Sequence, residues 1–232
     1  MSALLLVTAA LIACSGDKHG SADTTSSAAA KQTSGSVATQ TPAAGGQDTI
    51  TRLADKGRII GDSAAAVWVV MASDFQCPYC KQWHDAAFAG LVKDYVKTGR
   101  VRMAFLNMPL SMHQHAVPAA EAAMCASVQN KFWPMHDSLF ATQKIWEVLE
   151  SPLSTFDTLA NENHVEMTSW RSCMSKHATL PLIEADLDRA RQTGASSTPS
   201  FIVGTMKLSG ADANVRGAID SALKAAAAKP KR

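Results

Sequence analysis

The feature that most constrains the fold of this chain is a pair of cysteines, Cys77 and Cys80, placed between a predicted strand and a predicted helix. The β-branched and aromatic run 66–71 predicts a buried strand. Apolar residues at helical spacing over 81–97 predict the helix that follows. Two sulfurs three residues apart at a helix start share one face within bonding reach, which favours a redox-active dithiol.

The position of Cys77 at the predicted helix start indicates which sulfur attacks. Unpaired backbone N–H groups and the positive end of the helix dipole favour the thiolate there and lower its pKa. Cys77 is therefore the expected nucleophile, and Cys80 is expected to resolve the mixed disulfide with a substrate. Pro78 suits the first helical position, where its missing N–H is no loss. A structural disulfide or a zinc half-site is the alternative, but the helical region offers no second ligand pair of comparable spacing.

The first half of the folded part predicts a βαβ unit. The strand 66–71, the helix 81–97 and a second strand at 101–105 form this unit, whose crossover is right-handed and whose strands are parallel. A short strand candidate at 58–60 precedes it.

The second half predicts a helical region followed by a return to the sheet. Helical patterns dominate from about 116 to 191 and are broken at three prolines. Two strands and an Ala-rich helix then close the fold, at 200–203, 206–208 and 211–228. The predicted class is α/β, one sheet with an all-helical insertion at about 114–193 between its βαβ and ββα halves.

Several separated motifs occur in a fixed order along the chain, at 74–81 (DFQCPYCK), 109–110 with His113 and His115, 119–126, 131–137 and 198–201. Together they resemble the DsbA family of thioredoxin-fold proteins, over about residues 57–225. The resemblance implies a thioredoxin core with a helical insertion and thiol–disulfide exchange on exported proteins. It also implies that Pro199 is a cis-proline against the dithiol and that Thr198 offers backbone groups to an extended substrate. Pro78 and Tyr79 complete the expected substrate-binding residues.

One position departs from the family pattern. Many relatives carry a buried acid six residues before the first cysteine, where this chain has Met71. Strand alternation puts Met71 and Asp74 on opposite faces, so Asp74 is not an obvious replacement. Proton transfer at Cys80 then depends on water or on a neighbour such as His84, for which a plain helix-surface position is the alternative.

The N-terminus predicts export. Residues 3–13 form an uncharged apolar run, too short for a bilayer core that needs roughly 20 helical residues but typical of a secretory signal. Residues 11–14 (LIAC) resemble the bacterial lipobox, which implies removal of 1–13 and lipidation of Cys14. A plain signal peptide cleaved nearby and a buried N-terminal helix are the alternatives.

The predicted organisation after the signal is a tether, one domain and a short tail. Residues 14–49 are rich in Ser, Thr, Ala and Gly and bury too little apolar surface to fold, so we expect a disordered tether. The thioredoxin-like domain is expected at 50–228 and a basic tail at 229–232.

The last two cysteines, Cys125 and Cys173, both lie on predicted helices of the insertion. Export places them in a compartment that permits disulfides. A bond between them would close a loop of about 48 residues, worth about 4 kcal/mol on the chain-entropy estimate. Two buried free thiols are the alternative.

Charge and composition exclude some functions. With 22 Lys and Arg against 20 Asp and Glu, the chain has no basic field for a phosphate backbone, so no nucleic-acid partner is expected. Met108, Met112, His113 and His115 form a soft-ligand cluster that could attract Cu(I), although methionines that fill core gaps are the simpler interpretation. No cofactor and no metal site is predicted.

The predicted function is a thiol–disulfide oxidoreductase on the periplasmic side of the bacterial cell envelope, held by a lipid anchor. An oxidase that introduces disulfides into exported proteins is the preferred direction, and a membrane redox partner is expected to recycle the dithiol. A reductase or isomerase is the nearest alternative, but residues 15–49 are too polar for the dimerisation module that isomerases usually add. A copper-binding or chaperone-like module is the alternative from a different class.

Overall fold

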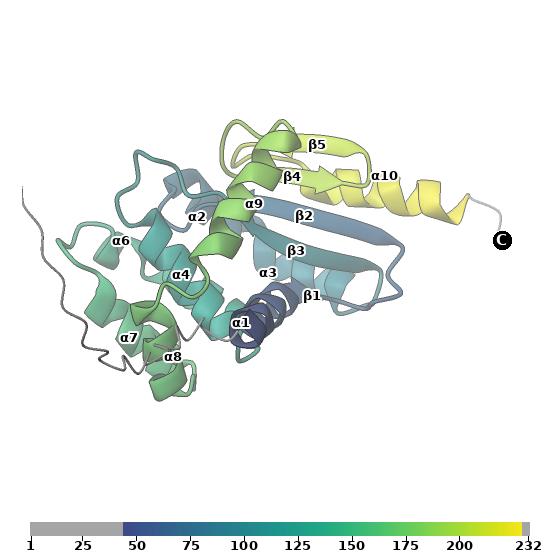
Figure 1. Ribbon diagram of the computed structural model, residues 1–232. Helices are drawn as coiled ribbons and strands as arrows, with labels where there is room; N and C mark the ends of the chain where they lie inside the picture. The colour runs from purple at the N-terminus through teal and green to yellow at the C-terminus, as the bar shows by residue number, and fades with distance from the viewer. Residues whose placement is uncertain (1–43, 229–232) are drawn as a thin grey trace, which may run out of the picture. The chain divides into compact units, whose positions relative to one another are not determined.

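The computed structural model describes residues 44–228, which form an α/β fold around one five-stranded mixed sheet (Figure 1). The strand order is β1-β3-β2-β4-β5. The central pair β2 and β3 is parallel, and the other three pairings are antiparallel. The strands are β1 (Ile59–Ile60), β2 (Val67–Ser73), β3 (Val101–Asn107), β4 (Ser200–Val203) and β5 (Met206–Ser209). Each predicted strand is confirmed, with ends that shift by one or two residues.

The helix that begins directly after Cys77 is continuous from Pro78 to Val96 but alternates between α and π turns. We call this stretch the Pro78 helix. Its parts are α2 (Pro78–Trp83), η1 (His84–Phe88), α3 (Ala89–Leu91) and η2 (Val92–Val96).

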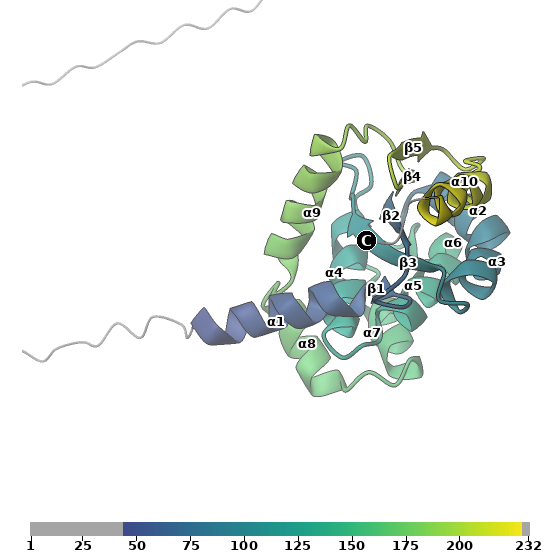
Figure 2. The ribbon, with the colours of Figure 1, turned by 90° about the vertical axis from the view of Figure 1, so that its right-hand side faces the viewer.

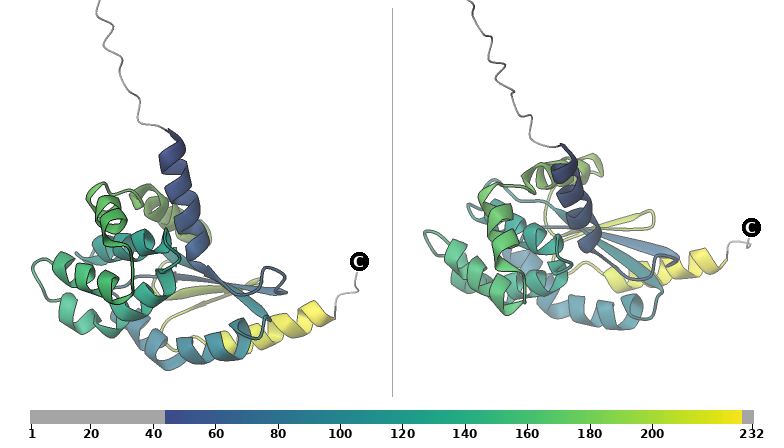
Figure 3. Two further views of the ribbon diagram at one scale, coloured as in Figure 1. Left: turned by 90° about the horizontal axis from the view of Figure 1, so that it is seen from below. Right: turned by 60° about the horizontal axis from the view of Figure 1, so that its bottom comes forward.

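The predicted insertion between β3 and β4 is entirely helical, and it lies at the end of the sheet where α2 begins (Figures 1 and 3). Its helices are α4 (Ala116–Ser127), α5 (Phe132–Ala141), α6 (Gln143–Trp146), α7 (Leu153–Glu162), α8 (Met167–Ser175) and α9 (Leu180–Gln192). The chain then returns through β4 and β5 to α10 (Val215–Ala227). This is the thioredoxin-like fold with a helical insertion that the sequence predicts.

The two faces of the sheet are covered by different helices. The Pro78 helix and α10 cover one face, and α9 crosses the other (Figure 2). Met71 on β2 lies at the centre, paired with Phe105 of β3 and Phe201 of β4, and all three side chains are buried. Each such side chain contributes about 1.5–3 kcal/mol through burial, so the strand that leads to the dithiol is anchored on both sides by buried neighbours.

An aromatic cluster joins the sheet to the insertion. Phe75, from the turn after β2, stacks on Phe105 with 5.0 Å between the ring centroids. It also packs against Phe140 of α5, with 5.1 Å between the ring centroids. His136 of α5 is fully buried among these rings. The turn that carries Cys77 is therefore packed from the insertion side as well as from the sheet.

The predicted boundary of the tether at residue 49 is wrong, because the first helix, α1 (Ala44–Gly57), begins before it. Gln47 Nε2 donates to the carbonyl of Ala178 at 2.6 Å, and Ile50 packs on the core. Further along, Ser127 Oγ of α4 donates to the carbonyl of Ala54 at 2.6 Å. These partners lie far away in the sequence, so local composition could not reveal them.

Several predictions lie outside the described residues: the signal peptide, lipidation at Cys14, most of the tether and the basic tail at 229–232. Within residues 44–228, no helix is both long and apolar enough to cross a membrane.

Candidate redox site

Cys77 is the N-cap residue of α2, immediately after the turn that leaves β2. Its N–H donates to the Asp74 carbonyl at 3.1 Å, and its own carbonyl accepts from the N–H groups of Cys80 and Lys81 at 3.1 and 3.2 Å. Pro78 lies in the first turn, as proline at a helix start does. The structure thus places the two sequence-predicted cysteines at the helix start, both as free thiols.

The environment separates the acidities of the two thiols. Both are buried, with Cys77 3% and Cys80 1% exposed. The pKa of Cys77 is lowered to about 6. The largest cause is a hydrogen bond from the Cys80 thiol, which outweighs the opposing effect of burial. Hydrogen bonds from Thr198 and from the N–H groups of Cys80 and Tyr79 lower the pKa of Cys77 further. Burial, followed by the hydrogen bond and charge of Cys77, raises the pKa of Cys80 well above its usual range. At neutral pH, Cys77 is a thiolate and Cys80 a thiol, the protonation states that an attacking and a resolving sulfur need.

The loop before β4 faces the sulfur of Cys77. The Thr198–Pro199 peptide bond is cis, and Cys77 Sγ lies 3.5 Å from the Thr198 carbonyl oxygen. A pocket of about 120 Å³ opens beside this loop, lined by residues 193–197, 200–202 and 207–209. On the helix side, Pro78 and Tyr79 are exposed, Tyr79 at 62%. The four predicted substrate-binding residues therefore flank the dithiol from two segments far apart in sequence.

Asp74 fixes the turn before Cys77, a role that the sequence did not suggest. Its carboxylate accepts from the N–H groups of Gln76 at 2.8 Å and Leu110 at 2.9 Å, and lies 2.7 Å from His113 Nδ1. Gln76 Oε1 in turn accepts the N–H of His115 at 2.7 Å. These bonds attach the loop 108–115 to the turn that precedes Cys77.

The same contacts divide the predicted copper-ligand cluster. The ring of His113 is bonded to Asp74, and His115 Nε2 lies 2.8 Å from the Leu149 carbonyl. Met108 is buried, whereas Met112 is 80% exposed. The two histidines thus make separate hydrogen bonds, Met108 packs in the core and Met112 is exposed to solvent, which argues against the copper-binding alternative.

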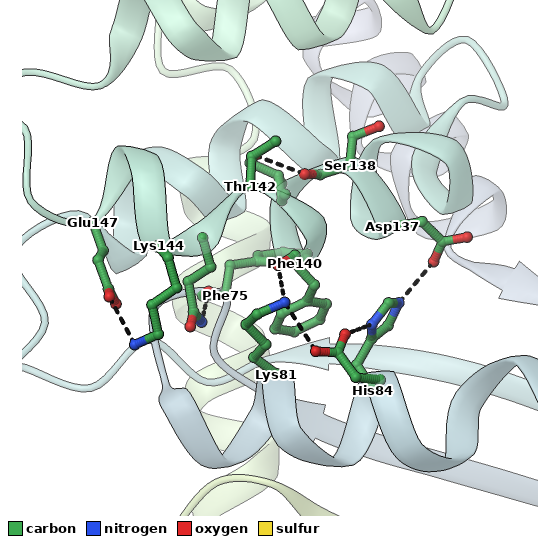
Figure 4. A network of polar contacts seen from close by, with 12 residues as sticks. Phe75, Lys81, His84, Asp137, Ser138, Phe140, Thr142, Lys144 and Glu147 are labelled. Carbon is green, nitrogen blue, oxygen red and sulfur yellow. Dashed lines mark hydrogen bonds and ion pairs between the residues drawn. The ribbon is translucent and has the colours of Figure 1, made fainter.

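Gln143 of α6 is a second residue that the sequence did not single out. It is fully buried, and its Nε2 donates to the carbonyls of Phe75 at 2.6 Å and Cys77 at 3.1 Å. Lys81 makes a parallel contact, from its Nζ to the Phe140 carbonyl at 2.8 Å (Figure 4). A single glutamine 66 positions after Cys77 carries no pattern that could have indicated this contact.

The structure also shows what surrounds Cys80 in place of a buried acid. Met71 is packed between strands, as described above, and the Ser73 side chain hydrogen-bonds Cys80. The ring of His84 is turned to two carboxylates, with Nδ1 3.0 Å from Asp85 and Nε2 3.1 Å from Asp137. Among the described residues, Ser73 rather than His84 is thus the polar side chain beside Cys80.

Cys125 of α4 and Cys173 of α8 are joined by a disulfide, with their Cα atoms 5.8 Å apart. The bond lies within the insertion and connects its first helix, α4, to α8, 48 positions later in the sequence. Within the described residues, Cys77 and Cys80 are the remaining cysteines.

Comparison with known proteins places this geometry in a family. A family model described as thioredoxin matches residues 53–221. The probable disulfide bond formation protein D of Bacillus anthracis is 26% identical over 170 residues, which cover 71% of this chain and 77% of that protein. The crystal structure of oxidised BdbD from Bacillus subtilis is 25% identical, with a TM-score of 0.65 over 73% of this chain and 94% of that one.

A higher identity occurs in a longer protein. The Na(+)/H(+) antiporter NhaA 3 of Salinispora tropica is 34% identical over 150 residues, 64% of this chain. The chain spans only 22% of the length of that antiporter, so the likeness concerns one part of it.

Proposed function

The chain belongs to the DsbA family of thioredoxin-fold thiol–disulfide oxidoreductases, and from this premise we propose that it oxidises cysteine pairs of exported proteins through Cys77 and Cys80. The observation that carries the proposal is the opposite displacement of the two thiol pKa values. A stabilised thiolate favours the reduced dithiol, and this makes the disulfide form a stronger oxidant. Each tenfold stabilisation raises the potential by about 30 mV.

The reaction proceeds by two exchanges. A substrate thiolate attacks Cys77 Sγ of the oxidised protein, the Cys77–Cys80 bond breaks, and the Cys80 sulfur leaves and takes up a proton. The second substrate thiolate then attacks the substrate sulfur of the mixed disulfide and releases Cys77 as a thiolate. The substrate loses two electrons to form its disulfide, and the protein gains them as the reduced dithiol. Release of Cys77 is fast because a sulfur of low pKa is a good leaving group.

Named residues around the dithiol have roles in this reaction. Ser73 supplies the hydrogen bond at Cys80 as its charge develops. Thr198 and Pro199 hold an extended substrate beside Cys77, and the exposed side chains of Pro78 and Tyr79 contact the residues that flank the substrate cysteine.

The setting that we propose is the periplasmic side of the bacterial cell envelope. A disulfide between Cys125 and Cys173 suits an oxidising compartment. The proposal includes export by the signal at 1–13, a lipid anchor at Cys14 and a membrane redox partner that reoxidises the dithiol after each turnover.

The test is the reduction potential of the Cys77–Cys80 pair in the full chain, equilibrated against glutathione. We expect a value well above −270 mV, toward the oxidising end of about −120 mV, whereas a value near −270 mV would identify a reductant and overturn the oxidase proposal. Oxidation of a reduced peptide with two cysteines gives the second measurement. Cys77→Ser should abolish this oxidation, and Cys125→Ser, the matched control, should retain it and mainly lower stability.

A further inference from the structure

Three side chains at the junction of the Pro78 helix and α5 converge on one point, and Figure 4 shows two of them, His84 and Asp137. They are His84, His136 and Asp137, and one ligand atom of each lies within 4.8 Å of the other two. Asp137 Oδ1 lies 3.1 Å from His84 Nε2 and 2.8 Å from His136 Nδ1. Two imidazole nitrogens and one carboxylate oxygen are a ligand set that zinc-class ions prefer, whereas calcium and magnesium prefer oxygen alone.

His84 is oriented as metal-binding histidines are. Its Nδ1 lies 3.0 Å from Asp85 Oδ1, and the other oxygen of Asp85 is held by Lys81 Nζ at 2.9 Å. A carboxylate on one ring nitrogen fixes the tautomer and directs the other nitrogen toward the ion. Here that other nitrogen, Nε2, faces Asp137, so the outer ligand shell of His84 is already built.

His136 is held rigidly by its surroundings. Its side chain is fully buried, and its ring meets those of Phe75, Phe105 and Phe140 at nearly right angles. Only Nδ1 finds a hydrogen-bonding partner among the described residues, whereas Nε2 is buried without one. When Nδ1 binds an ion, the ring proton sits on Nε2, inside the aromatic cluster that surrounds the ring.

The cluster borders a pocket at the protein surface. A pocket of about 560 Å³ is lined by His84, Asp85, Phe88 and Asp137, among others. Asp137 is exposed, so an ion and its water can enter without unfolding either helix.

We propose that His84, His136 and Asp137 bind a divalent transition-metal ion of the zinc class, with water in the remaining position. The ion takes the place of the protons that now lie between Asp137 and the two rings: His84 releases one, and His136 moves its own to Nε2. The bound ion ties η1 to α5 and so stabilises the segment that follows the dithiol. This site uses neither Cys77 nor Cys80 and is independent of the oxidase proposal.

The experiment uses the full chain with Cys77 and Cys80 oxidised to a disulfide, so that no thiolate competes for metal. Cobalt(II) serves as the spectroscopic probe for zinc. We expect one equivalent to give the visible absorption of a four-coordinate site, to be displaced by zinc, and to raise the melting temperature. Because removal of a buried ring can unfold the protein, the test variants are His84→Asn and Asp137→Asn, with His164→Asn as the matched surface control.

The outcomes are distinct. The site is supported if both test variants lose the absorption and Asp85→Asn weakens zinc binding by about 10–100-fold, the usual effect of removing an outer-shell carboxylate, while the control binds as the parent does. The proposal is overturned if cobalt stays six-coordinate, if no equivalent binds, or if His84→Asn and Asp137→Asn bind as tightly as the control.

Discussion

At the scale of single residues, the thiolate of Cys77 depends on neutral groups. The largest influences that lower its pKa come from the Cys80 thiol, Thr198 and the backbone N–H groups of Cys80 and Tyr79. None of these carries a net charge at neutral pH. The thiolate is therefore stabilised by dipoles within one helical turn and by the facing loop, and such short-range contacts are not screened by dissolved ions as a distant charge pair is.

This leads to a prediction for pH dependence. The thiolate fraction grows as pH rises through the pKa, so alkylation of the reduced protein by iodoacetamide should rise along a curve with its midpoint near pH 6 and then level off. The midpoint should be nearly the same at low and high salt. Mass spectrometry should place the modification on Cys77. A midpoint near that of an ordinary thiol, or modification mainly on Cys80, would contradict this account.

The second prediction at this scale concerns Gln143. In Gln143→Leu, the Phe75 carbonyl loses its partner and the Cys77 carbonyl keeps only its helical N–H groups. An unsatisfied buried acceptor costs about 1–3 kcal/mol, so the free energy of unfolding in urea should fall by that amount. Lys144→Ala is the control, because this neighbour on α6 is exposed and should change stability by less than about 1 kcal/mol. Equal losses in the two variants would refute a specific role for Gln143.

At the scale of secondary-structure elements, one buried carboxylate attaches α9 to the sheet. Asp186 of α9 is fully buried and pairs with Arg58, which lies just before β1. The same carboxylate accepts the backbone N–H and the Nδ2 of Asn107, at the end of β3, at 3.2 and 2.8 Å. Arg189 reaches it from the surface at 3.2 Å. Three segments and two arginines, one buried and one exposed, therefore meet at one aspartate.

These two arginines give a matched comparison. Asp186→Ala leaves Arg58 charged and buried without this partner, and breaking a buried pair in this way costs about 3–5 kcal/mol. Arg189→Ala removes only the exposed partner, and we expect a cost of at most about 1 kcal/mol. Urea denaturation of both variants measures the difference. If the two variants lost similar stability, the buried pair would not be what fixes α9.

At the scale of the whole molecule, the sequence predicts those features that depend on local residue patterns or on the fixed order of the family motifs. Strand and helix periods gave the sheet and its helical insertion, and the dithiol was evident from Cys77 and Cys80 alone. The interactions of Asp74 and Gln143 could not be predicted, because each depends on backbone groups brought close only by the tertiary fold. The start of α1 was missed for the same reason, since its partners lie on α4 and after α8.

The three-residue cluster at the Pro78 helix shows the same limit. A search for two histidines at helical spacing finds no metal site, because His84 and His136 lie on different elements, 52 positions apart. Packing of α5 against the Pro78 helix is what brings them together. Sites made across such an interface need coordinates, whereas sites made within one turn, such as the dithiol, do not.

The disulfide between Cys125 and Cys173 tests how far the insertion and the redox site are energetically separate. It closes a loop of 48 residues, so replacement of both cysteines by serine should lower the free energy of unfolding by about 4 kcal/mol, chiefly because the unfolded chain gains freedom. The bond joins α4 to α8, whereas the pKa of Cys77 is set by groups of α2 and the loop before β4. The double variant should therefore melt earlier yet keep the alkylation midpoint near pH 6 and the rate of peptide oxidation at temperatures where it is folded. A shifted midpoint in the folded variant would show instead that the insertion influences the pKa of Cys77 through the contacts of Gln143 and Lys81.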